Sequence, residues 1–437
     1  MIRPNPRKQD PRPAMTVAEA SLEALIDSLG RRARAAAEAL AAVDPAPKND
    51  ALHRMAAAFD ARRDEIRAEN AKDLAAGKER GLSPAMLDRL ALSDKGIDGL
   101  IKAVREIAAL PDPVGEITEM RPRPNGLLVG KMLAPIGVIG IIYESRPNVT
   151  VDAGALCLKS GNAVILRGGS EAIHSNRVLA AIMAECADAA GLPEGAVQLV
   201  PTTDREAVGW LLKADQWVDL IIPRGGKSLI HRIVQDSIIP VIKHLDGNCM
   251  VYVDEGADLA MAERIVLNSK VQRPGVCNAA ETLLVHAAEA GAFLPGAVAA
   301  LQGAGVEVRG CPQTAALAQG VVPATDADWD EEYLDLIIAV RVVDSFDEAV
   351  QFINAHSSGH TEAIVTRDVA RSQAFTRRIK SACVHVNAST RFSDGGEYGL
   401  GAEIGISTDK LHARGPMGLR ELTCAKWIAL GTGQVRA

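Results

Sequence analysis

The most constraining feature of this 437-residue chain is a strand–helix rhythm that begins near Pro135. Short runs rich in Val, Ile and Leu alternate with longer Ala-rich stretches of helical periodicity. Continuous apolar runs are typical of parallel strands whose two faces are both covered by helices. We expect one sheet from strands at 136–143, 163–167, 196–200, 218–222 and 240–242, and a second from strands at 281–286, 306–308, 336–343, 363–366 and 384–387. The pattern predicts an α/β protein, with a doubly wound parallel sheet followed by a second α/β domain.

The chain before Pro135 differs in character. Residues 1–15 are basic and Pro-rich and are expected to form a disordered tail, and Met15 is an alternative start to Met1. Helices are expected at 17–42, 50–76 and 97–110, and Ser83-Pro84 predicts a cap and the first turn of a helix that runs toward Leu90. The pair Asn125-Gly126 then predicts a hairpin whose second strand covers 127–133. Such a hairpin is either an oligomer contact or a simple surface ribbon.

Composition excludes several classes of protein. A net charge of −7 argues against a general nucleic-acid or membrane-surface role. No apolar run approaches membrane-spanning length and the N-terminus lacks a hydrophobic secretory core, so we expect a cytoplasmic protein. The seven cysteines contain no CxxC, which argues against the usual zinc sites and a disulfide framework.

Cys277 is the candidate nucleophile. It lies on a tight connection between a helix-like run at 260–270 and a strand candidate at 282–286, and Pro274 and Gly275 are expected to end the helix and turn the chain. Arg273 is four residues before the thiol, and a nearby positive charge lowers a thiol pKa. A buried, inert thiol is the commoner state of a free cysteine, so both interpretations stay open at this point.

Two glycine turns follow strands and are candidate nucleotide contacts. Arg167, before Gly168, ends the second strand, where an acid often holds a ribose 2′-OH; its forked donors suit a 2′-phosphate and favour NADPH over NADH. The turn Arg224-Gly225-Gly226-Lys227 offers backbone N–H groups and two cations to an anion. Neither a GxGxxG nor a Walker motif is present, and each turn could equally be an ordinary surface turn.

A third basic segment contains Arg391 among Ser and Thr residues directly after a strand, where it could hold a carboxylate or phosphate. The stretch from Lys410 to Gly415 adds positive charge downstream. The alternative is a solvated loop.

Seven motifs together make the chain similar to the gamma-glutamyl phosphate reductases, a branch of the aldehyde dehydrogenase superfamily that works in proline biosynthesis. The resemblance runs from about residue 18 to the C-terminus and is densest at 135–140, 143–150, 166–169, 222–226, 272–278, 387–392 and 410–418. It implies an aldehyde dehydrogenase-like fold with an NADPH-binding domain at 16–115 and 134–256 and a catalytic domain at 257–410. It also implies an oligomerisation element at 116–133 and 411–437, and hence a homo-oligomer.

The resemblance also implies roles for individual residues. Cys277 matches the nucleophile, and Glu331 aligns near the nicotinamide ribose, with Glu332 an equally good candidate. The backbone N–H of Cys277 and the side chain of Asn148 are candidate oxyanion donors. The implied cofactor-binding residues are Arg167, Gly168, Arg224, Gly225, Gly226, Lys227 and Glu331. The implied substrate-binding residues are Arg146, Asn148, Arg273, Arg391 and His412.

One departure from the wider superfamily is informative. Oxidising aldehyde dehydrogenases carry a glutamate base that activates a deacylating water, whereas the corresponding stretch here is His244-Leu245-Asp246-Gly247-Asn248. An enzyme that reduces its thioester has no use for that base. The implied activity is therefore NADPH-dependent reduction of L-glutamate 5-phosphate to L-glutamate 5-semialdehyde and phosphate. A conventional NAD(P)-dependent aldehyde dehydrogenase and a catalytically inactive assembly partner are the alternatives, and a transient contact with glutamate 5-kinase is a further prediction without a motif.

Overall fold

The computed structural model describes residues 17–436 and divides the chain into two units. The first unit contains the described residues up to Gly225, residues 232–241 and those from Ala425 onward. The second contains residues 226–231 and 242–424. No helix of the described chain is both long and apolar enough to span a membrane.

The first unit begins with five helices: α1 (Val17–Leu40), α2 (Pro45–Ala61), α3 (Arg63–Glu79), α4 (Pro84–Leu90) and α5 (Asp94–Ala109). The Ser83 side chain caps α4 by accepting a hydrogen bond from the N–H of Met86, which confirms the predicted cap. The single helix expected at 50–76 is wrong. It is divided at Arg62, which leaves helical geometry (φ −107°, ψ 25°) and forms an ion pair with Glu185 on α7 (Ile173–Ala189).

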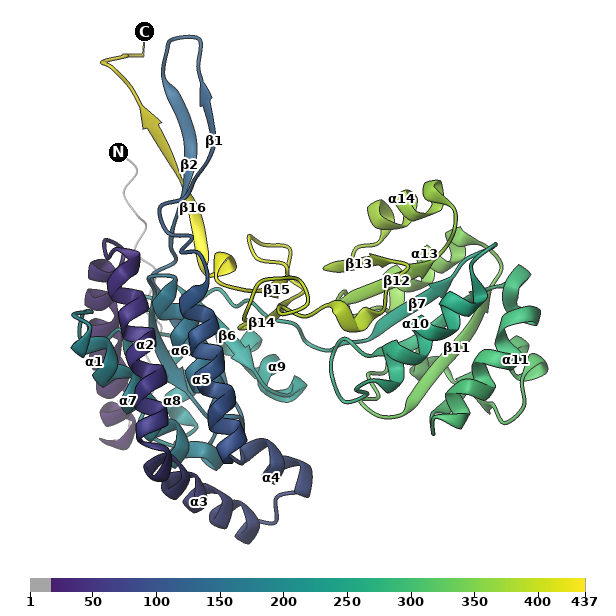
Figure 1. The fold of residues 1–437 in the computed structure, drawn as a ribbon, viewed down its shortest axis with the longest axis horizontal. Helices are drawn as coiled ribbons and strands as arrows, with labels where there is room; N and C mark the ends of the chain where they lie inside the picture. Colours follow the sequence, from purple (N-terminus) through teal and green to yellow (C-terminus); the bar gives the residue numbers. More distant parts are fainter. Residues whose placement is uncertain (1–16, 437) are drawn as a thin grey trace. The chain divides into compact units, whose positions relative to one another are not determined.

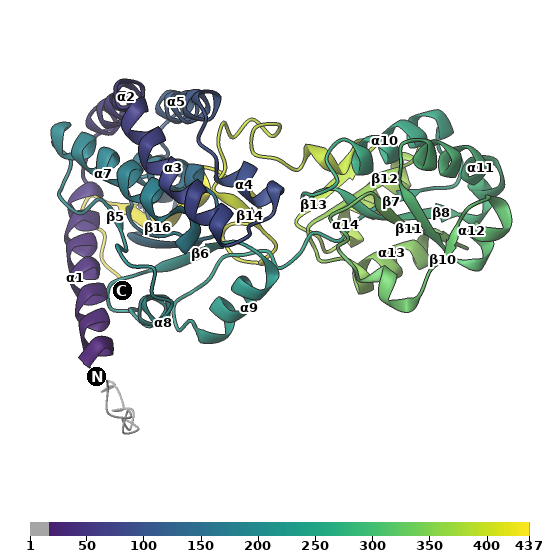
Figure 2. The same ribbon diagram turned by 90° about the horizontal axis from the view of Figure 1, so that it is seen from below.

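The first sheet is parallel and has the strand order β5-β4-β3-β6. Its strands are β3 (Val138–Tyr143), β4 (Ala163–Arg167), β5 (Val197–Leu199) and β6 (Leu220–Arg224), joined by α6 (Pro147–Lys159), α7 (Ile173–Ala189) and α8 (Glu206–Leu211). Every residue of β3 and β4 is buried, as expected for strands covered on both faces. Helices α2 and α5 pack onto α7 and α6 as a further layer, and α1 packs with α8 (Figure 2).

A three-stranded ribbon projects from the helices of the first unit (Figure 1). It contains β1 (Ile117–Pro122), β2 (Leu128–Pro135) and the C-terminal β16 (Thr423–Leu430). β1 and β2 are antiparallel, and Gly126 in the turn between them has φ +83°, a backbone conformation that favours glycine. The predicted hairpin is therefore present, and the chain's last strand joins it.

The second unit is built on a seven-stranded parallel sheet of order β10-β9-β11-β8-β7-β12-β13. Its strands are β7 (Cys249–Val253), β8 (Ala280–His286), β9 (Glu307–Gly310), β10 (Val322–Pro323), β11 (Ile337–Val343), β12 (Thr361–Val365) and β13 (Cys383–Val386). Its helices are α10 (Leu259–Val271), α11 (Ala287–Gly303), α12 (Pro312–Leu317), α13 (Phe346–His356) and α14 (Val369–Arg378), and a small antiparallel pair consists of β14 (Gly405–Ser407) and β15 (Gly415–Met417).

Two features of the chain lie at the boundary of the units. β7 pairs with β8 and β12 in the second sheet, whereas the domain boundary expected from the sequence falls after it, at residue 256. Helix α9 (Lys227–Asp236) has its first residues in the second unit and its last residues in the first.

Candidate active site

Cys277 lies on the eight-residue connection between α10 and β8. A turn closed by the N–H of Ala279 and the carbonyl of Val276 holds the thiol just before the strand begins. Cys277 is half-buried, whereas five of the other six cysteines are buried and Cys424 is exposed. The connection thus presents Cys277, and not the buried cysteines, to ligands in solution.

The segment that leads into β7 packs against this connection. A Cβ atom at Gly247 would lie 2.0 Å from the carbonyl oxygen of Cys277 and 2.4 Å from its Cα, so only glycine fits there. The Gly247 N–H donates to the Glu332 carboxylate over 2.8 Å, and the Cys249 thiol donates to the Cys277 carbonyl over 3.2 Å. Burial raises the pKa of Glu332.

The loop that carries Arg391 is hydrogen-bonded to the same connection. The amide of Asn278 donates to the carbonyl of Ser393 over 2.9 Å, and the Thr390 hydroxyl donates to the carbonyl of Asn278 over 2.7 Å. The Arg391 guanidinium donates to the Asn278 side-chain oxygen and, over 2.8 Å, to Gln272. Burial, and then the positive charge of Arg273, lower the pKa of Arg391. Two cationic groups therefore gather beside Cys277, as an anionic substrate requires.

The remaining predicted residues of the second unit make other contacts. The ring of His412 is exposed, and its Nε2 lies 3.1 Å from the carbonyl of Glu421, so it contacts the segment before β16 rather than the Cys277 connection. Lys227 forms a 2.6 Å ion pair with Asp246, which raises the pKa of Lys227. Glu331 is exposed, whereas its neighbour Glu332 is half-buried and bonded to Gly247. Of the two acids weighed from the sequence, the structure brings Glu332 to the candidate site.

In the first unit the predicted residues follow the carboxyl ends of neighbouring strands. Arg224 is opposite the last residue of β3, and Arg167 is opposite the residue before it. Arg146 caps α6 directly after β3, and the Asn148 amide donates to Asp152 over 3.0 Å. Because the chain runs from β3 through β4 to β5 and then crosses back to β6, this edge is a topological switch point, the usual nucleotide site of an open α/β sheet.

Arg167 is buried, and its guanidinium donates to the backbone carbonyls of Gly168, Thr203 and Asp204. Burial lowers its pKa, and Glu171 opposes that effect. A Cβ at Gly168 would lie 2.1 Å from Nδ2 of Asn176, so glycine is needed there as well. Nε of Arg167 and Nδ2 of Asn176 are buried without a hydrogen-bond partner, so this edge has donors to offer to a ligand.

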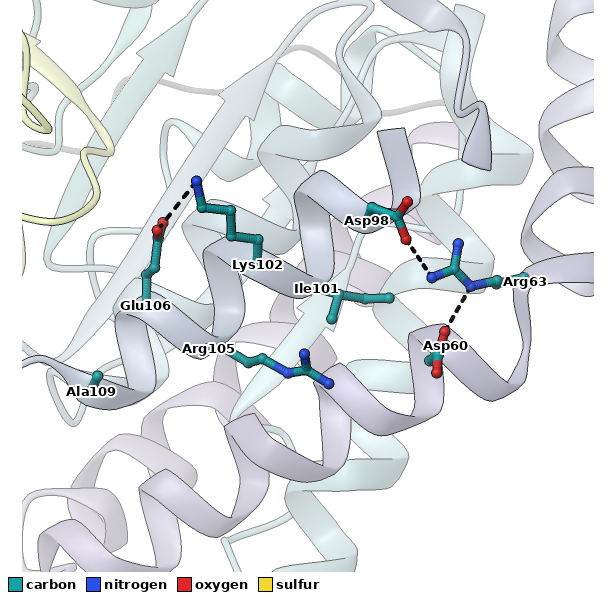
Figure 3. Close-up of a pocket in the computed structure, with 8 residues that line it drawn as sticks. All are labelled: Asp60, Arg63, Asp98, Ile101, Lys102, Arg105, Glu106 and Ala109. Atoms are coloured by element: carbon teal, nitrogen blue, oxygen red, sulfur yellow. Dashed lines mark hydrogen bonds and ion pairs between the residues drawn. The ribbon is translucent and has the colours of Figure 1, made fainter. Parts of the chain in front are cut away.

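A charged pocket elsewhere on the first unit contains none of the predicted residues. It has a volume of about 460 Å³ and lies among α2, α3 and α5 (Figure 3). Arg63 bonds Asp60 and Asp98, and Lys102 pairs with Glu106 (Figure 3). Most of its charges neutralise one another, and we do not place the active site there.

Sequence reasoning missed three contributors to the site. Gly247 and Cys249 contact Cys277 only through the pairing of β7 with β8. A fully buried ion pair of 2.5 Å joins Lys270, at the end of α10, to Glu281, at the start of β8, and so links the two ends of the Cys277 connection. Pairing of helical and strand residues eleven positions apart leaves no local signal in the sequence.

Comparison with known proteins agrees with this arrangement. The aldehyde dehydrogenase family model matches residues 5–314 and 317–427. The gamma-glutamyl phosphate reductase of Moorella thermoacetica is 56% identical over 411 residues, which cover 94% of this chain and 98% of the relative. That of Magnetococcus marinus is 57% identical over 416 residues, with coverage of 94% and 98%.

Solved structures extend the comparison. The crystal structure of gamma-glutamyl phosphate reductase from Thermotoga maritima has a TM-score of 0.92 and 46% identity, covering 94% of this chain and 100% of its own. An acetylating aldehyde dehydrogenase from Geobacillus thermoglucosidasius, 18% identical with a TM-score of 0.67, shares the fold. This chain therefore belongs to the aldehyde dehydrogenase family and, within it, to the gamma-glutamyl phosphate reductases.

Proposed function

We propose that this protein reduces L-glutamate 5-phosphate to L-glutamate 5-semialdehyde with release of phosphate, the second step of proline biosynthesis from glutamate. Family membership supports the reaction. One observation assigns this reaction to named residues. The half-buried Cys277 lies beside Arg273 and Arg391, on a connection that Asn278 links to the Arg391 loop by hydrogen bonds.

The Cys277 thiolate attacks the acyl carbon of the substrate. The tetrahedral intermediate places an oxyanion beside the backbone N–H of Cys277, a candidate donor. The carbon–oxygen bond to phosphate then breaks, which leaves a thioester on the sulfur and releases phosphate. Arg273 and Arg391 balance the negative charge of the substrate and of the departing phosphate.

The thioester must survive until it is reduced. Asp246, the carboxylate nearest in sequence to the missing glutamate base, is paired with Lys227, and Nδ1 of His244 lies 3.2 Å from the Ile406 carbonyl. Both groups are thus held by contacts with other residues of the second unit. A nicotinamide cofactor, when bound, supplies the hydride that converts the thioester to the thiohemiacetal from which the semialdehyde is released.

We assign cofactor binding to the carboxyl edge of the first sheet and propose NADPH as the cofactor. Arg224, Gly225, Gly226 and Lys227 would hold the pyrophosphate, and Arg167 and Gly168 the adenosine ribose. The charge of Arg205 acts on Arg167 and adds to the attraction for a 2′-phosphate, whereas the Glu171 carboxylate nearby would favour a ribose diol. Arg167→Ala should therefore weaken NADPH binding selectively. Equal losses for NADPH and NADH would contradict the 2′-phosphate assignment.

We further propose a cytoplasmic homo-oligomer, assembled through the ribbon of β1, β2 and β16. Ile117, Trp427 and Leu430 are half or more exposed on this ribbon. Sedimentation of the native protein and of a Trp427→Ser, Leu430→Ser variant tests the assembly. Contact with glutamate 5-kinase, which would shield a labile acyl phosphate, is tested by co-sedimentation of the two enzymes.

The reverse reaction tests the proposed activity. We expect reduction of NADP⁺ to depend on both L-glutamate 5-semialdehyde and phosphate, and Cys277→Ser to abolish it while the protein stays folded. Formation of glutamate without phosphate would instead favour the alternative, a conventional NAD(P)-dependent aldehyde dehydrogenase. Retained turnover by Cys277→Ser would discard the nucleophilic role of Cys277.

A further inference from the structure

The proposed mechanism leaves unused a second cysteine that touches the nucleophile's backbone. Cys249 begins β7, next to the amino end of β8, and it is fully buried. Its thiol donates to the Cys277 carbonyl over 3.2 Å. Within one cysteine the sulfur and the carbonyl oxygen are about 3–5 Å apart, depending on the rotamer. The two sulfur atoms are therefore no more than about 8 Å apart, a gap that rotation of both side chains and a shift of the connection can close.

The surroundings of Cys249 are polar as well as buried. Nδ1 of His360 lies 3.7 Å from the Cys249 sulfur, and Nε2 of the same ring is buried without a hydrogen-bond partner. Burial, and then the ring of His244, lower the pKa of His360 to about 3, so its imidazole is neutral. The same Nδ1 lies 2.8 Å from the Thr361 hydroxyl, which holds the ring in place beside the Cys249 sulfur.

The two thiols differ in accessibility, which sets an order of events. Burial raises the pKa of Cys249 well above the ordinary value, so this thiol stays protonated and is shielded from dissolved oxidants. Cys277 is half-buried beside two arginines, so an oxidant meets it first. An accessible reactive thiol with a second thiol beside it is the arrangement of redox-sensitive cysteine pairs.

We propose that Cys249 is a resolving thiol that captures oxidised Cys277 as a disulfide and so protects the nucleophile from irreversible oxidation. Hydrogen peroxide transfers one oxygen atom to the Cys277 thiolate, giving a sulfenic acid and hydroxide. The Cys249 sulfur then attacks the Cys277 sulfur. The sulfur–oxygen bond breaks, the sulfur–sulfur bond forms, and the proton of Cys249 leaves with the hydroxyl group as water. A dithiol reductant reverses the reaction.

The test uses the full-length protein and hydrogen peroxide, and its readouts are independent of substrate. The inference rests on the proposed function only in taking Cys277 as the reactive thiol, so alkylation of Cys277 before oxidation is measured first. Trypsin separates the two cysteines into peptides 244–264 and 271–309, because Arg273 precedes a proline. We expect peroxide to join these two peptides with loss of two hydrogen atoms. We also expect dithiothreitol to restore alkylation of Cys277.

In Cys249→Ser we expect peroxide to add two oxygen atoms to Cys277, as a sulfinic acid, and the alkylation recovered by dithiothreitol to fall about tenfold. Cys311→Ser, which alters another buried cysteine of the same unit, should recover like the native protein. Absence of the joined peptide from the native protein, or equal recovery in Cys249→Ser, would overturn the proposal. Failure of Cys277 to alkylate at all would instead count against the proposed function.

Discussion

Replacing Lys270 with Met would leave the Glu281 carboxylate buried without its ion-pair partner, at the ends of the Cys277 connection. Lys270 and Glu281 are fully buried and 2.5 Å apart, and burial raises the pKa of Glu281 even with its partner present. Without Lys270, no positive charge in the pair opposes the rise in the pKa of Glu281 that burial causes, and Glu281 is expected to take up a proton. The perturbation therefore converts an ion pair into a neutral buried acid.

The cost follows from that protonation. An ordinary glutamate has a pKa of about 4.3, so protonating it at pH 7 costs about 3.7 kcal/mol, at about 1.36 kcal/mol per pH unit. At pH 5 the same step costs about 1 kcal/mol. The folded-state pKa of Glu281 is above the unfolded one, so the folded variant binds more protons between these values. Its stability must fall as pH rises through this window.

Urea unfolding followed by circular dichroism at pH 5 and pH 7 measures this difference. We expect Lys270→Met to lose about 3–4 kcal/mol at pH 7 and much less at pH 5, and Lys270→Met with Glu281→Gln to recover most of the loss, since replacing both members of a buried pair is often neutral. Lys48→Met breaks a comparable buried pair with Asp112 in the first unit. Only the Lys270 variant should alter the alkylation rate of Cys277. An equal loss at both pH values would refute the reasoning.

Three further predictions follow from single contacts. Gly247→Ala places a Cβ 2.0 Å from the Cys277 carbonyl and should slow turnover at least about tenfold. Gly291→Ala, in open space on α11, should leave turnover unchanged. Steady-state kinetics measures both variants, and equal effects would contradict the packing role of Gly247. Asn278→Ala removes one of the two side-chain partners of Arg391, leaving Gln272, and should raise KM for the acyl phosphate about tenfold; an unchanged KM would separate Arg391 from substrate binding. Burial raises the pKa of Glu362 to about 8, so folding stability should fall as pH rises from about 5 to 8, and Glu362→Gln should make that slope shallower. Urea unfolding across this range measures the slope, and an unchanged slope would assign it to other groups.

The sequence predicts the parts of this fold that depend on local pattern. The apolar run Ala163–Arg167 is a strand over its whole length, and Ser83-Pro84 is a helix start, because both follow from chemistry carried by adjacent residues. Pro274 and Gly275 likewise place Cys277 between a helix and a strand. The division of the helix expected at 50–76 could not be predicted, since Arg62 finds its partner, Glu185, on a helix far along the chain.

The candidate site shows the same limit. Glu332 accepts a hydrogen bond from Gly247, which is 85 residues away, and no local pattern separates Glu332 from its neighbour Glu331. The guanidinium of Arg167, the residue proposed to contact the adenosine ribose, also donates to the carbonyls of Thr203 and Asp204 after β5, and no motif indicates these contacts. Motifs identify which residues carry charge, whereas tertiary pairing decides where that charge is directed.

The central claim is that an acyl group passes to the sulfur of Cys277. Incubating the protein with L-glutamate 5-semialdehyde and NADP⁺ in the absence of phosphate, quenching with acid and mapping the tryptic peptides tests this claim most directly. We predict a glutamyl group on peptide 271–309 that hydroxylamine removes, and its disappearance when phosphate is added before the quench. A glutamyl group on another peptide, or phosphate-dependent turnover by a protein whose Cys277 is alkylated, would contradict the account.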